Sequence, residues 1–461
     1  MSHYLSEPVD NPTPIWPVTA EALEGWLGEQ DDAVRDWLTA NGFKAKSGET
    51  VPVPDGRGGV AGVALGLGAG DDMWAWGDLA QTLPLATYAI DGALSGEQAT
   101  GAALAWSLGT YRFTRYKNMD EDLATLVMPE NADAGYVRRA AGATSLVRDL
   151  INTPAGDMAP PQLAEAAEIL ADKHNAACTV LAGDDLLMEA YPAIHAVGRA
   201  SINWPRLIDL VWGDPDDPKV TLVGKGVCFD TGGLDLKPAA AMLKMKKDMG
   251  GAATVLGVAA MIMDAGLPVR LRVLIPAVEN SVSRDSYRPG DILQTRKRLT
   301  VEVGNTDAEG RIVLCDALTE ADHESPELLI DCATLTGAAR VALGPDLPAL
   351  FTNNDDLARD LLAHGTAQSD PLWRMPLFAP YRKRLESKVA DLNNVSDGPF
   401  AGAITAALYL QHFVEHAKAW AHIDLYAWND TKRPGRPVGG EAMTMRAIYA
   451  LIAERYPAPS A

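Results

Sequence analysis

Cysteine is scarce in this chain of 461 residues. Only Cys178, Cys228, Cys315 and Cys332 are present. No two of them stand close enough to form a C-x-x-C pair, which argues against a zinc knuckle. We therefore expect reduced, buried thiols in a cytoplasmic protein.

Long hydrophobic runs are also missing. No uninterrupted apolar stretch is long enough to span a bilayer. The N-terminal stretch MSHYLSEPVDNPTPIW has no basic start followed by an apolar run, so a signal peptide is not expected. Both observations predict a protein without a membrane partner.

Positive charge is in deficit. The sequence has 40 Lys and Arg against 61 Asp and Glu, a formal net charge of −21. Non-specific nucleic-acid binding is driven by Lys and Arg, so this balance argues against a nucleic-acid partner. The excess of carboxylates suits a soluble protein or one that needs cations.

Internal repeats and low-complexity segments are absent, and the length predicts two domains. The first part contains a helical pattern over residues 20–38, a buried strand near Gly58 and an Ala-rich helix over 97–108. From about Val180, apolar strands alternate with helical segments, which indicates α/β architecture with a mostly parallel or mixed sheet. We predict a smaller α/β domain over residues 1–135 and a larger one with a central mixed sheet over 136–461. An acidic segment, 120–134, suggests the boundary.

Three clusters combine charged residues with glycines: VGKGVCFDTGGLDLKP at 223–238, MKKDMGGAA at 245–253 and NTDAEGR at 305–311. The first and third follow predicted strands, and α/β sheets bind ligands outside the carboxyl ends of strands. A phosphate-binding P-loop needs G-x-x-x-x-G-K followed by Ser or Thr. Gly224, Lys225 and Gly226 have neither that spacing nor the hydroxyl, so a P-loop is excluded.

Four carboxylates stand in these clusters, Asp230, Asp248, Asp307 and Glu309. Taken alone, N-T-D-A-E-G could be a solvated turn. Oxygen ligands suit hard or borderline divalent ions, and two such ions can share bridging carboxylates. In an extended segment the Asp-x-Glu spacing would place both side chains on one face. Crowded carboxylates repel until a cation sits between them, so the pattern favours a metal site.

Taken together, the three clusters resemble the leucyl aminopeptidase family, the cytosolic dinuclear metallopeptidases. Further fragments agree, over roughly residues 111–424: YRFTRYK from Tyr111, VRDLINTPAGDMAPP from Val147, DCATLTGA from Asp331 and ADLNNVS from Ala390. The resemblance implies a variable N-terminal α/β domain before the catalytic domain. It also implies a homohexamer.

The resemblance implies two metal sites. Lys225, Asp230, Asp248 and Glu309 would hold the tighter ion. Asp230, Asp307 and Glu309 would hold the more exchangeable one, helped by the Asp307 carbonyl. A lysine can act as a ligand if the nearby dication strips its proton. These ligands would accept manganese or zinc, and also magnesium or cobalt.

The resemblance also assigns catalytic roles. Lys237 would stabilise the developing oxyanion. Arg311 would bind a bicarbonate that takes a proton from the metal-bridging water. Taken alone, Lys237 could be a solvated charge, Arg311 a salt-bridge partner, and Lys225 could pair with Asp230 across a turn. The positions expected to contact the substrate's first side chain are Met245, Thr334, Gly337 and Tyr426.

The implied reaction releases the N-terminal residue from peptides with a free N-terminus, by attack of the water that bridges the two ions. Two alternatives remain open at this point. One is a dipeptidase of narrow specificity, such as one that cleaves cysteinyl-glycine. The other is a DNA-binding architectural protein on the same fold.

The sequence departs from the family pattern at three places. Thr231 replaces a serine, and Arg298 stands near a position where a glycine often precedes the strand. After H-I-D-L the family continues with a small residue and a glycine, whereas this chain has Tyr426 and Ala427. These replacements predict an altered first-residue preference with the metal chemistry intact.

Overall fold

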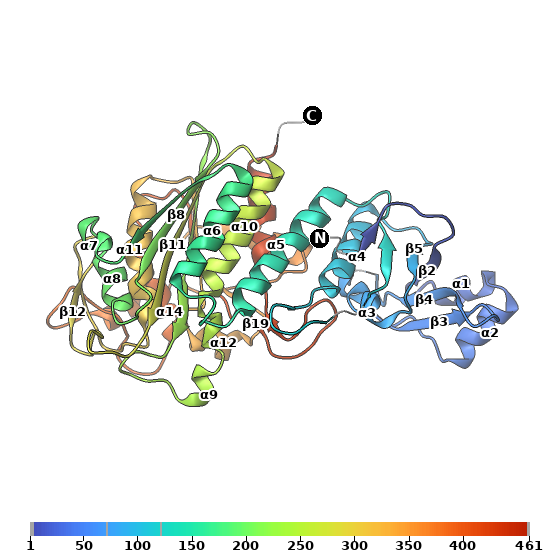
Figure 1. Cartoon of the computed structure of the whole chain (residues 1–461), viewed down its shortest axis with the longest axis horizontal. Helices are drawn as coiled ribbons and strands as arrows, with labels where there is room; N and C mark the ends of the chain where they lie inside the picture. Colours follow the sequence, from blue (N-terminus) through green and yellow to red (C-terminus); the bar gives the residue numbers. More distant parts are fainter. Residues whose placement is uncertain (1–3, 71, 120–121, 459–461) are drawn as a thin grey trace. The chain divides into compact units, whose positions relative to one another are not determined.

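The computed structural model describes residues 4–70, 72–119 and 122–458 (Figure 1). The chain divides into two compact units, one of residues 1–145 with 430–438 and one of residues 146–429 with 439–461. Residues 120–121 of the acidic segment lie outside the described residues. The domain boundary predicted after residue 135 stays a prediction.

The first unit is built on a sheet that has six strands among the described residues. Its order is β1 (Leu5–Ser6), β6 (Thr125–Val127), β5 (Thr87–Ile90), β2 (Thr13–Val18), β4 (Val60–Gly66) and β3 (Thr50–Pro54). Only β3 runs antiparallel to its neighbour. The Ala-rich segment forms α4 (Gly96–Gly109), which begins with a capping box between Ser95 and Gln98.

The helix predicted over residues 20–38 is two helices, α1 (Leu23–Glu29) and α2 (Asp32–Ala40). Gln30 has extended backbone angles, with ψ at 152°, and ends the first helix. Asp31, with ψ at 148°, precedes the second. The extended backbone of these two residues separates the helices, a break that the hydrophobic period alone does not reveal.

The second unit contains a mixed sheet, as predicted, with nine strands among the described residues. The order is β16 (Trp373–Arg374), β15 (Ala349–Thr352), β18 (Trp420–Asp424), β14 (Leu328–Ala333), β9 (Lys219–Gly224), β11 (Arg270–Asn280), β8 (Arg206–Trp212) and β7 (Ala177–Ala182), and β10 (Gly226–Asp230) also pairs with β11. The central four strands, β18 to β11, are parallel. One predicted strand, VTLVGKGVCF, is divided at Lys225 into β9 and β10.

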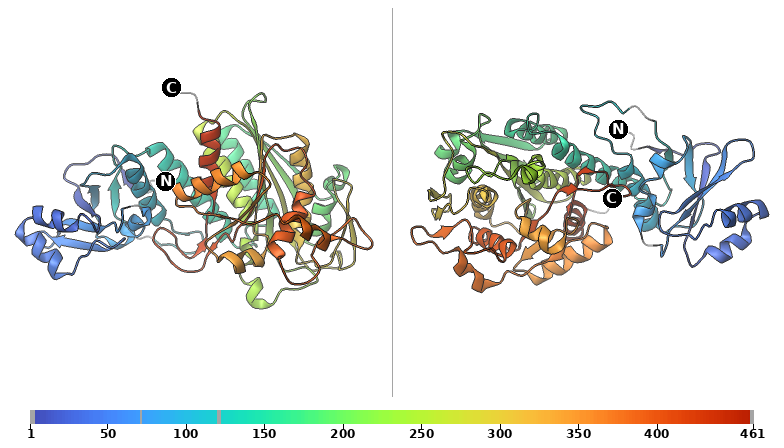
Figure 2. Two further views of the ribbon diagram at one scale, coloured as in Figure 1. Left: turned by 180° about the vertical axis from the view of Figure 1, so that it is seen from behind. Right: turned by 90° about the horizontal axis from the view of Figure 1, so that it is seen from below.

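Helices cover both faces of this sheet (Figures 1 and 2). On one face, α6 (Pro160–His174) and α10 (Gly250–Ala265) pack together, and α15 (Met445–Arg455) lies against α10 and α13 (Asp355–Ala367). On the other face, α11 (Glu309–His323) packs against α8 (Pro192–Gly198) and α14 (Gly402–Gln411). The other elements are η1 (Met73–Trp76), α3 (Leu79–Thr82), α5 (Ala134–Asn152), α7 (Asp185–Met188), α9 (Ala239–Met242), η2 (Met245–Met249), β12 (Ile292–Gln294), β13 (Thr300–Glu302), α12 (Gly337–Leu343), η3 (Ala379–Leu385), β17 (Leu392–Asn393), β19 (Trp428–Asn429) and β20 (Gly439–Gly440).

One helical stretch, Met245–Ala265, is long and apolar enough to cross a membrane. A search for uninterrupted apolar runs misses it, because Lys and Asp residues open the stretch. Its apolar window is 83% buried inside the protein. Core helices of soluble proteins pass the same test, so the stretch is weak evidence for a membrane span. Its place in the fold is that of a core helix.

Candidate active site

The predicted metal ligands lie where strands of the larger sheet end. Lys225 directly follows β9, and Asp230 is the last residue of β10. Asp248 lies in the 3-10 helix η2 immediately before α10, and Glu309 is the first residue of α11. The chain therefore brings these residues to the edge of the sheet at which α/β proteins bind ligands.

A glycine fixes the position of Lys225. A Cβ atom on Gly251 would lie 2.1 Å from the carbonyl oxygen of Cys332 and 2.9 Å from the Lys225 nitrogen. The start of α10 can therefore approach the ends of β9 and β14 only without a side chain there. The Lys225 amide donates to the Cys332 carbonyl at 3.0 Å, and the Ala252 amide donates to the Lys225 carbonyl at 2.9 Å.

The Lys225 ammonium lies among carboxylates in the interior. Its Nζ is 2.7 Å from Oδ2 of Asp248 and 2.9 Å from Oε1 of Glu309, and it donates to the Thr334 carbonyl at 3.1 Å. Burial lowers the pKa of Lys225, but Asp248 and Glu309 outweigh this and raise the pKa above its ordinary value. Lys225 therefore pairs with these two residues, and not with Asp230 across the turn.

Lys237 joins two of the other predicted ligands. Its Nζ lies 2.7 Å from Oδ2 of Asp230 and also pairs with Asp307. The second Asp230 oxygen accepts hydrogen bonds from the Gly232 amide and the Asn280 side chain, both at 2.8 Å. Burial and the Asp248 charge raise the pKa of Asp230 to about 6, against the lowering effect of Lys237.

The Glu309 carboxylate is incompletely satisfied by the described residues around it. It is buried, and its Oε2 atom has no hydrogen-bond partner among the described residues. Burial, with the Asp230 charge, raises the pKa of Glu309 to about 8. An orphaned, buried carboxylate oxygen is costly unless a cation or a proton satisfies it. This observation supports a metal ion at the site.

The geometry of the carboxylates fits a divalent ion. Oxygens of Asp230, Asp307 and Glu309 all lie within 4.8 Å of one another. Metal–oxygen distances of about 2.0–2.6 Å allow one cation to contact all three. The sequence suggested an extended segment for Asp307 and Glu309, and the structure differs. Asp307 lies in a turn and Glu309 begins α11, so the turn brings the two carboxylates together.

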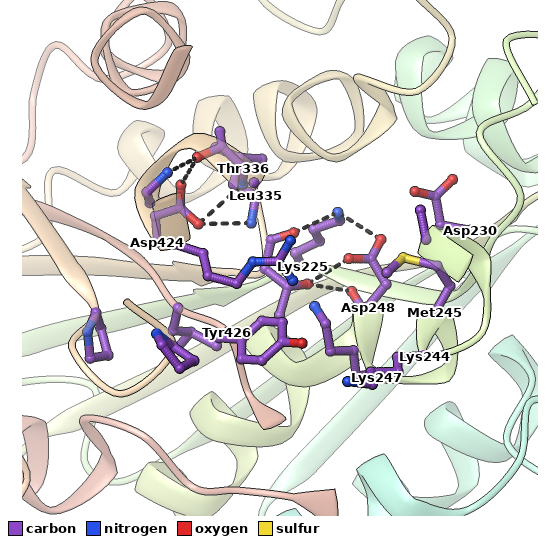
Figure 3. A pocket seen from close by; sticks show the side chains of 18 of the residues that line it. Lys225, Asp230, Lys244, Met245, Lys247, Asp248, Leu335, Thr336, Asp424 and Tyr426 are labelled. Atoms are coloured by element: carbon purple, nitrogen blue, oxygen red, sulfur yellow. Dashed lines mark hydrogen bonds and ion pairs between the residues drawn. The ribbon is translucent and has the colours of Figure 1, made fainter. Parts of the chain in front are cut away.

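A cavity of about 350 Å³ opens beside these groups. The four positions predicted to contact the substrate's first side chain all line it, and so does Lys237. Figure 3 shows Met245 and Tyr426 at this cavity together with Lys225 and Asp248. The residues of the lining that were predicted from the sequence are Lys225, Asp230, Lys237, Met245, Asp248, Asp307, Glu309, Thr334, Gly337 and Tyr426.

Arg311 is the predicted site residue that does not line this cavity. It lies in the first turn of α11, two residues after Glu309, and is mostly buried. Its Nη1 donates to the Asn394 carbonyl at 2.7 Å, while its Nε has no partner among the described residues. Burial lowers the pKa of Arg311. A buried, unpaired N–H group is suited to an anion.

Sequence reasoning missed four charged residues of the cavity wall, Lys244, Lys247, Arg340 and Asp424. Lys247 stands directly before Asp248 in the MKKDMGGAA cluster, and this neighbouring position is the feature of the sequence that points to it. Burial lowers the pKa of Lys247 to about 8, against the raising effect of Asp248. Asp424 ends β18 and accepts hydrogen bonds from the amides of Leu335 and Thr336, at 3.0 and 3.2 Å.

Two departures from the family pattern share a backbone feature. Ala427 stands where the family has a glycine, and its φ angle is 55°. Arg298, near the other glycine position, has a φ angle of 66°. Left-handed backbone favours glycine because a Cβ atom crowds the following carbonyl there. The structure therefore retains a glycine-like backbone at both positions with other residues in place.

Comparisons with known proteins match most of the chain. Residues 145–451 match the cytosol aminopeptidase family, catalytic domain, and residues 13–129 match the M17 aminopeptidase N-terminal domain. A probable cytosol aminopeptidase of Syntrophotalea carbinolica is 38% identical over 95% of this chain and 94% of its own length.

Solved structures are similar over nearly the whole chain. The cytosol aminopeptidase from Coxiella burnetii is 49% identical and has a TM-score of 0.95, covering 99% of this chain and 100% of that one. The bottromycin maturation enzyme BotP in complex with Mn is 34% identical with a TM-score of 0.87, covering 96% and 99%. The chain belongs to the cytosol aminopeptidase family and is a metallo-exopeptidase hydrolase.

Proposed function

We propose that this protein removes the N-terminal residue from peptides with a free α-amine, using two divalent metal ions. One observation carries the proposal: four carboxylates and two lysines converge on a single cavity. Manganese or zinc is the expected metal, and the manganese complex of the related BotP supports a divalent ion.

The donor set supports two neighbouring ions. Asp230, Asp307 and Glu309 would hold the more exchangeable ion, because their oxygens already lie close together. Lys225, Asp230, Asp248 and Glu309 would hold the tighter one, and Lys225 would then have to lose a proton that it now shares with two carboxylates. When bound, the two ions would supply Lewis acidity and a bridging water as the nucleophile.

Two further side chains would act on the reacting atoms. Lys237 has its ammonium between Asp230 and Asp307, at the wall of the cavity, from where it can donate to the carbonyl oxygen of the scissile peptide bond. That donation would stabilise the developing oxyanion. Arg311 would hold a bicarbonate through its unpartnered Nε, and this anion would accept a proton.

We also propose a cytoplasmic homohexamer. Relatives named cytosol aminopeptidases support the location, and the hexamer rests on the family resemblance alone. A DNA-binding role is disfavoured by the net charge of −21. A narrow dipeptidase remains the rival. Sedimentation velocity would test the hexamer, and a mobility-shift assay at several salt concentrations would test DNA binding.

A panel of aminoacyl amides and dipeptides, each assayed with manganese, zinc, magnesium or cobalt, tests the function. The proposal expects hydrolysis of several aminoacyl amides and none of their N-acetylated forms. Hydrolysis confined to one dipeptide would instead establish the dipeptidase. Cleavage of N-acetylated peptides at the same rate would overturn the exopeptidase assignment.

A further inference from the structure

The cavity has two cations at the side chain that is predicted to contact the first residue of the substrate. The Nζ atom of Lys247 lies 4.8 Å from the centre of the Tyr426 ring, and the Cζ atom of Arg340 lies 4.9 Å from the same centre. All three residues line the cavity. Figure 3 shows Lys247 and Tyr426 next to each other at its wall.

Neither cation forms an ion pair with a carboxylate of the described residues, although Asp248 and Asp424 attract Lys247 electrostatically. Among the residues that the structure describes, no Asp or Glu oxygen lies within ion-pair distance of Lys247 or Arg340, although Lys247 is only 6% exposed. Asp424 lines the same cavity, but it is already engaged. It accepts hydrogen bonds from the Leu335 amide, the Thr336 amide and, at 2.6 Å, the Thr336 hydroxyl.

A buried ammonium without a counter-ion is costly, and a contact with an aromatic face compensates only part of the cost. An anion that enters the cavity would complete the compensation. Arg340 is exposed at the cavity wall, so it can meet such an anion from the solvent side, while Lys247 meets it from the buried side. Guanidinium and ammonium groups together are a common recognition pair for a carboxylate.

We propose that Lys247 and Arg340 bind the side-chain carboxylate of the substrate's first residue, so that the enzyme prefers peptides that begin with Asp or Glu. The inference rests on the proposed aminopeptidase function, because that function places the first side chain beside Tyr426. The same two cations disfavour a first residue that is Lys or Arg, through like-charge repulsion. The C-terminal carboxylate of a dipeptide has the same chemistry, and the experiment separates the two sources.

The test uses matched p-nitroanilides of Glu and Gln, which differ in charge and hardly in size. We expect kcat/KM for the Glu substrate to exceed that for the Gln substrate by about ten- to a hundred-fold, the range of a charge-assisted hydrogen bond. Arg340→Met and Lys247→Met should each lower this ratio. Arg359→Met removes an exposed guanidinium from α13, outside the cavity lining, and should leave the ratio unchanged.

A ratio taken on one preparation is independent of the fraction of active enzyme, so partial misfolding does not imitate the result. Metal content is measured as well, since Lys247 adjoins Asp248. If Gln and Leu substrates are cleaved but the wild-type Glu/Gln ratio is one or less, the inference is wrong and the proposed function stands. If no aminoacyl anilide is cleaved with any ion, the proposed function itself is wrong.

Two more outcomes decide the residue assignment and the source of the carboxylate. A high Glu/Gln ratio that neither variant lowers would overturn the roles of Lys247 and Arg340. The dipeptides Leu-Gly and Leu-Gly-amide are compared in the same assay. A strong preference for the free acid that both variants abolish would show that the cations bind the C-terminal carboxylate, and would overturn the proposal.

Discussion

The ammonium of Lys225 lies 2.9 Å from Oε1 of Glu309, while Oε2 of the same carboxylate has no hydrogen-bond partner among the described residues. The chain thus neutralises one oxygen of Glu309, and an oxygen of this carboxylate also lies within 4.8 Å of oxygens of Asp230 and Asp307. Two ammonium groups serve four carboxylates here, which leaves negative charge for added cations to neutralise.

Chelation is therefore expected to abolish hydrolysis of aminoacyl amides, and a divalent ion should restore it. The reason is that both the nucleophile and the charge balance of the site depend on the ions. Activity is measured before chelation, after it and after addition of manganese or zinc, with elemental analysis of each sample.

The control is the same treatment followed by metal-free buffer alone, which should leave the enzyme inactive. Full turnover by a preparation that elemental analysis shows to be free of metal would exclude the proposed mechanism.

Lys237→Ala should separate chemistry from metal binding. The proposed role of Lys237 is to stabilise the oxyanion, and loss of one such donor lowers turnover by about a hundred- to a thousand-fold. The variant should keep its metal, since Asp230 and Asp307 are then relieved of an ammonium that competes for their oxygens. Turnover and metal content are measured on the same samples.

Asp248→Ala is the matched variant for this test, because Asp248 is a proposed ligand and contacts Lys225 and not Lys237. It should lose metal as well as activity. Should Lys237→Ala bind less metal while its turnover stays near normal, the two roles have been assigned wrongly.

The pH dependence of stability should include a contribution from His422. This side chain is fully buried, and its Nδ1 lies 2.5 Å from Oδ1 of Asp331. Burial lowers the pKa of His422, but Asp331 outweighs it, so the net shift is upward from 6.5. The stabilisation is therefore complete below pH 6.5 and is lost as the pH rises through the raised folded-state pKa.

Urea denaturation at several pH values from 6 upward measures this effect. The free energy of unfolding should fall with rising pH more steeply in the wild type than in His422→Gln. The substitution His323→Gln, at a largely exposed histidine, should leave the slope unchanged. Equal slopes for the wild type and His422→Gln would show that the pair does not titrate in this range.

The sequence was sufficient for the mixed sheet and for the place of three proposed ligands, Lys225, Asp230 and Glu309, which lie at one cavity. Each of them stands beside a strong apolar or glycine-rich pattern. Those patterns are local and follow from strand and turn chemistry. The conformation of the Asp307–Glu309 pair was predicted wrongly. A spacing of two residues suggests a strand, whereas the start of α11 overrides that local preference.

The cations at Tyr426 could not be predicted in the same way. Lys247 and Arg340 are far apart in the sequence and come from η2 and α12. The folded chain brings their side chains to one ring. Lys247 stands in the MKKDMGGAA cluster, but nothing in the sequence relates it to Arg340 or Tyr426, so the contact becomes visible only in the folded chain.

Tyr426→Ala should change the preference for the first residue of the substrate. Tyr426 lines the cavity where the family has a small residue, so its removal adds space beside Met245 and Thr334. The ratio of kcat/KM for leucyl over alanyl substrates should rise. If a larger side chain fills the added space, the rise corresponds to a difference in transition-state free energy of about 1–3 kcal/mol. The two substrates are compared on one preparation of each protein.

Tyr426→Phe is the control, because it keeps the ring that contacts Lys247 and Arg340 and removes only the hydroxyl. It should leave the leucyl/alanyl ratio close to that of the wild type, since the volume of the pocket barely changes. A rise of similar size in both variants would assign the effect to the hydroxyl and not to the volume of the ring. An unchanged ratio in Tyr426→Ala would mean that the first side chain does not reach this wall, and the acidic preference argued from Lys247 and Arg340 would then lose its structural basis as well.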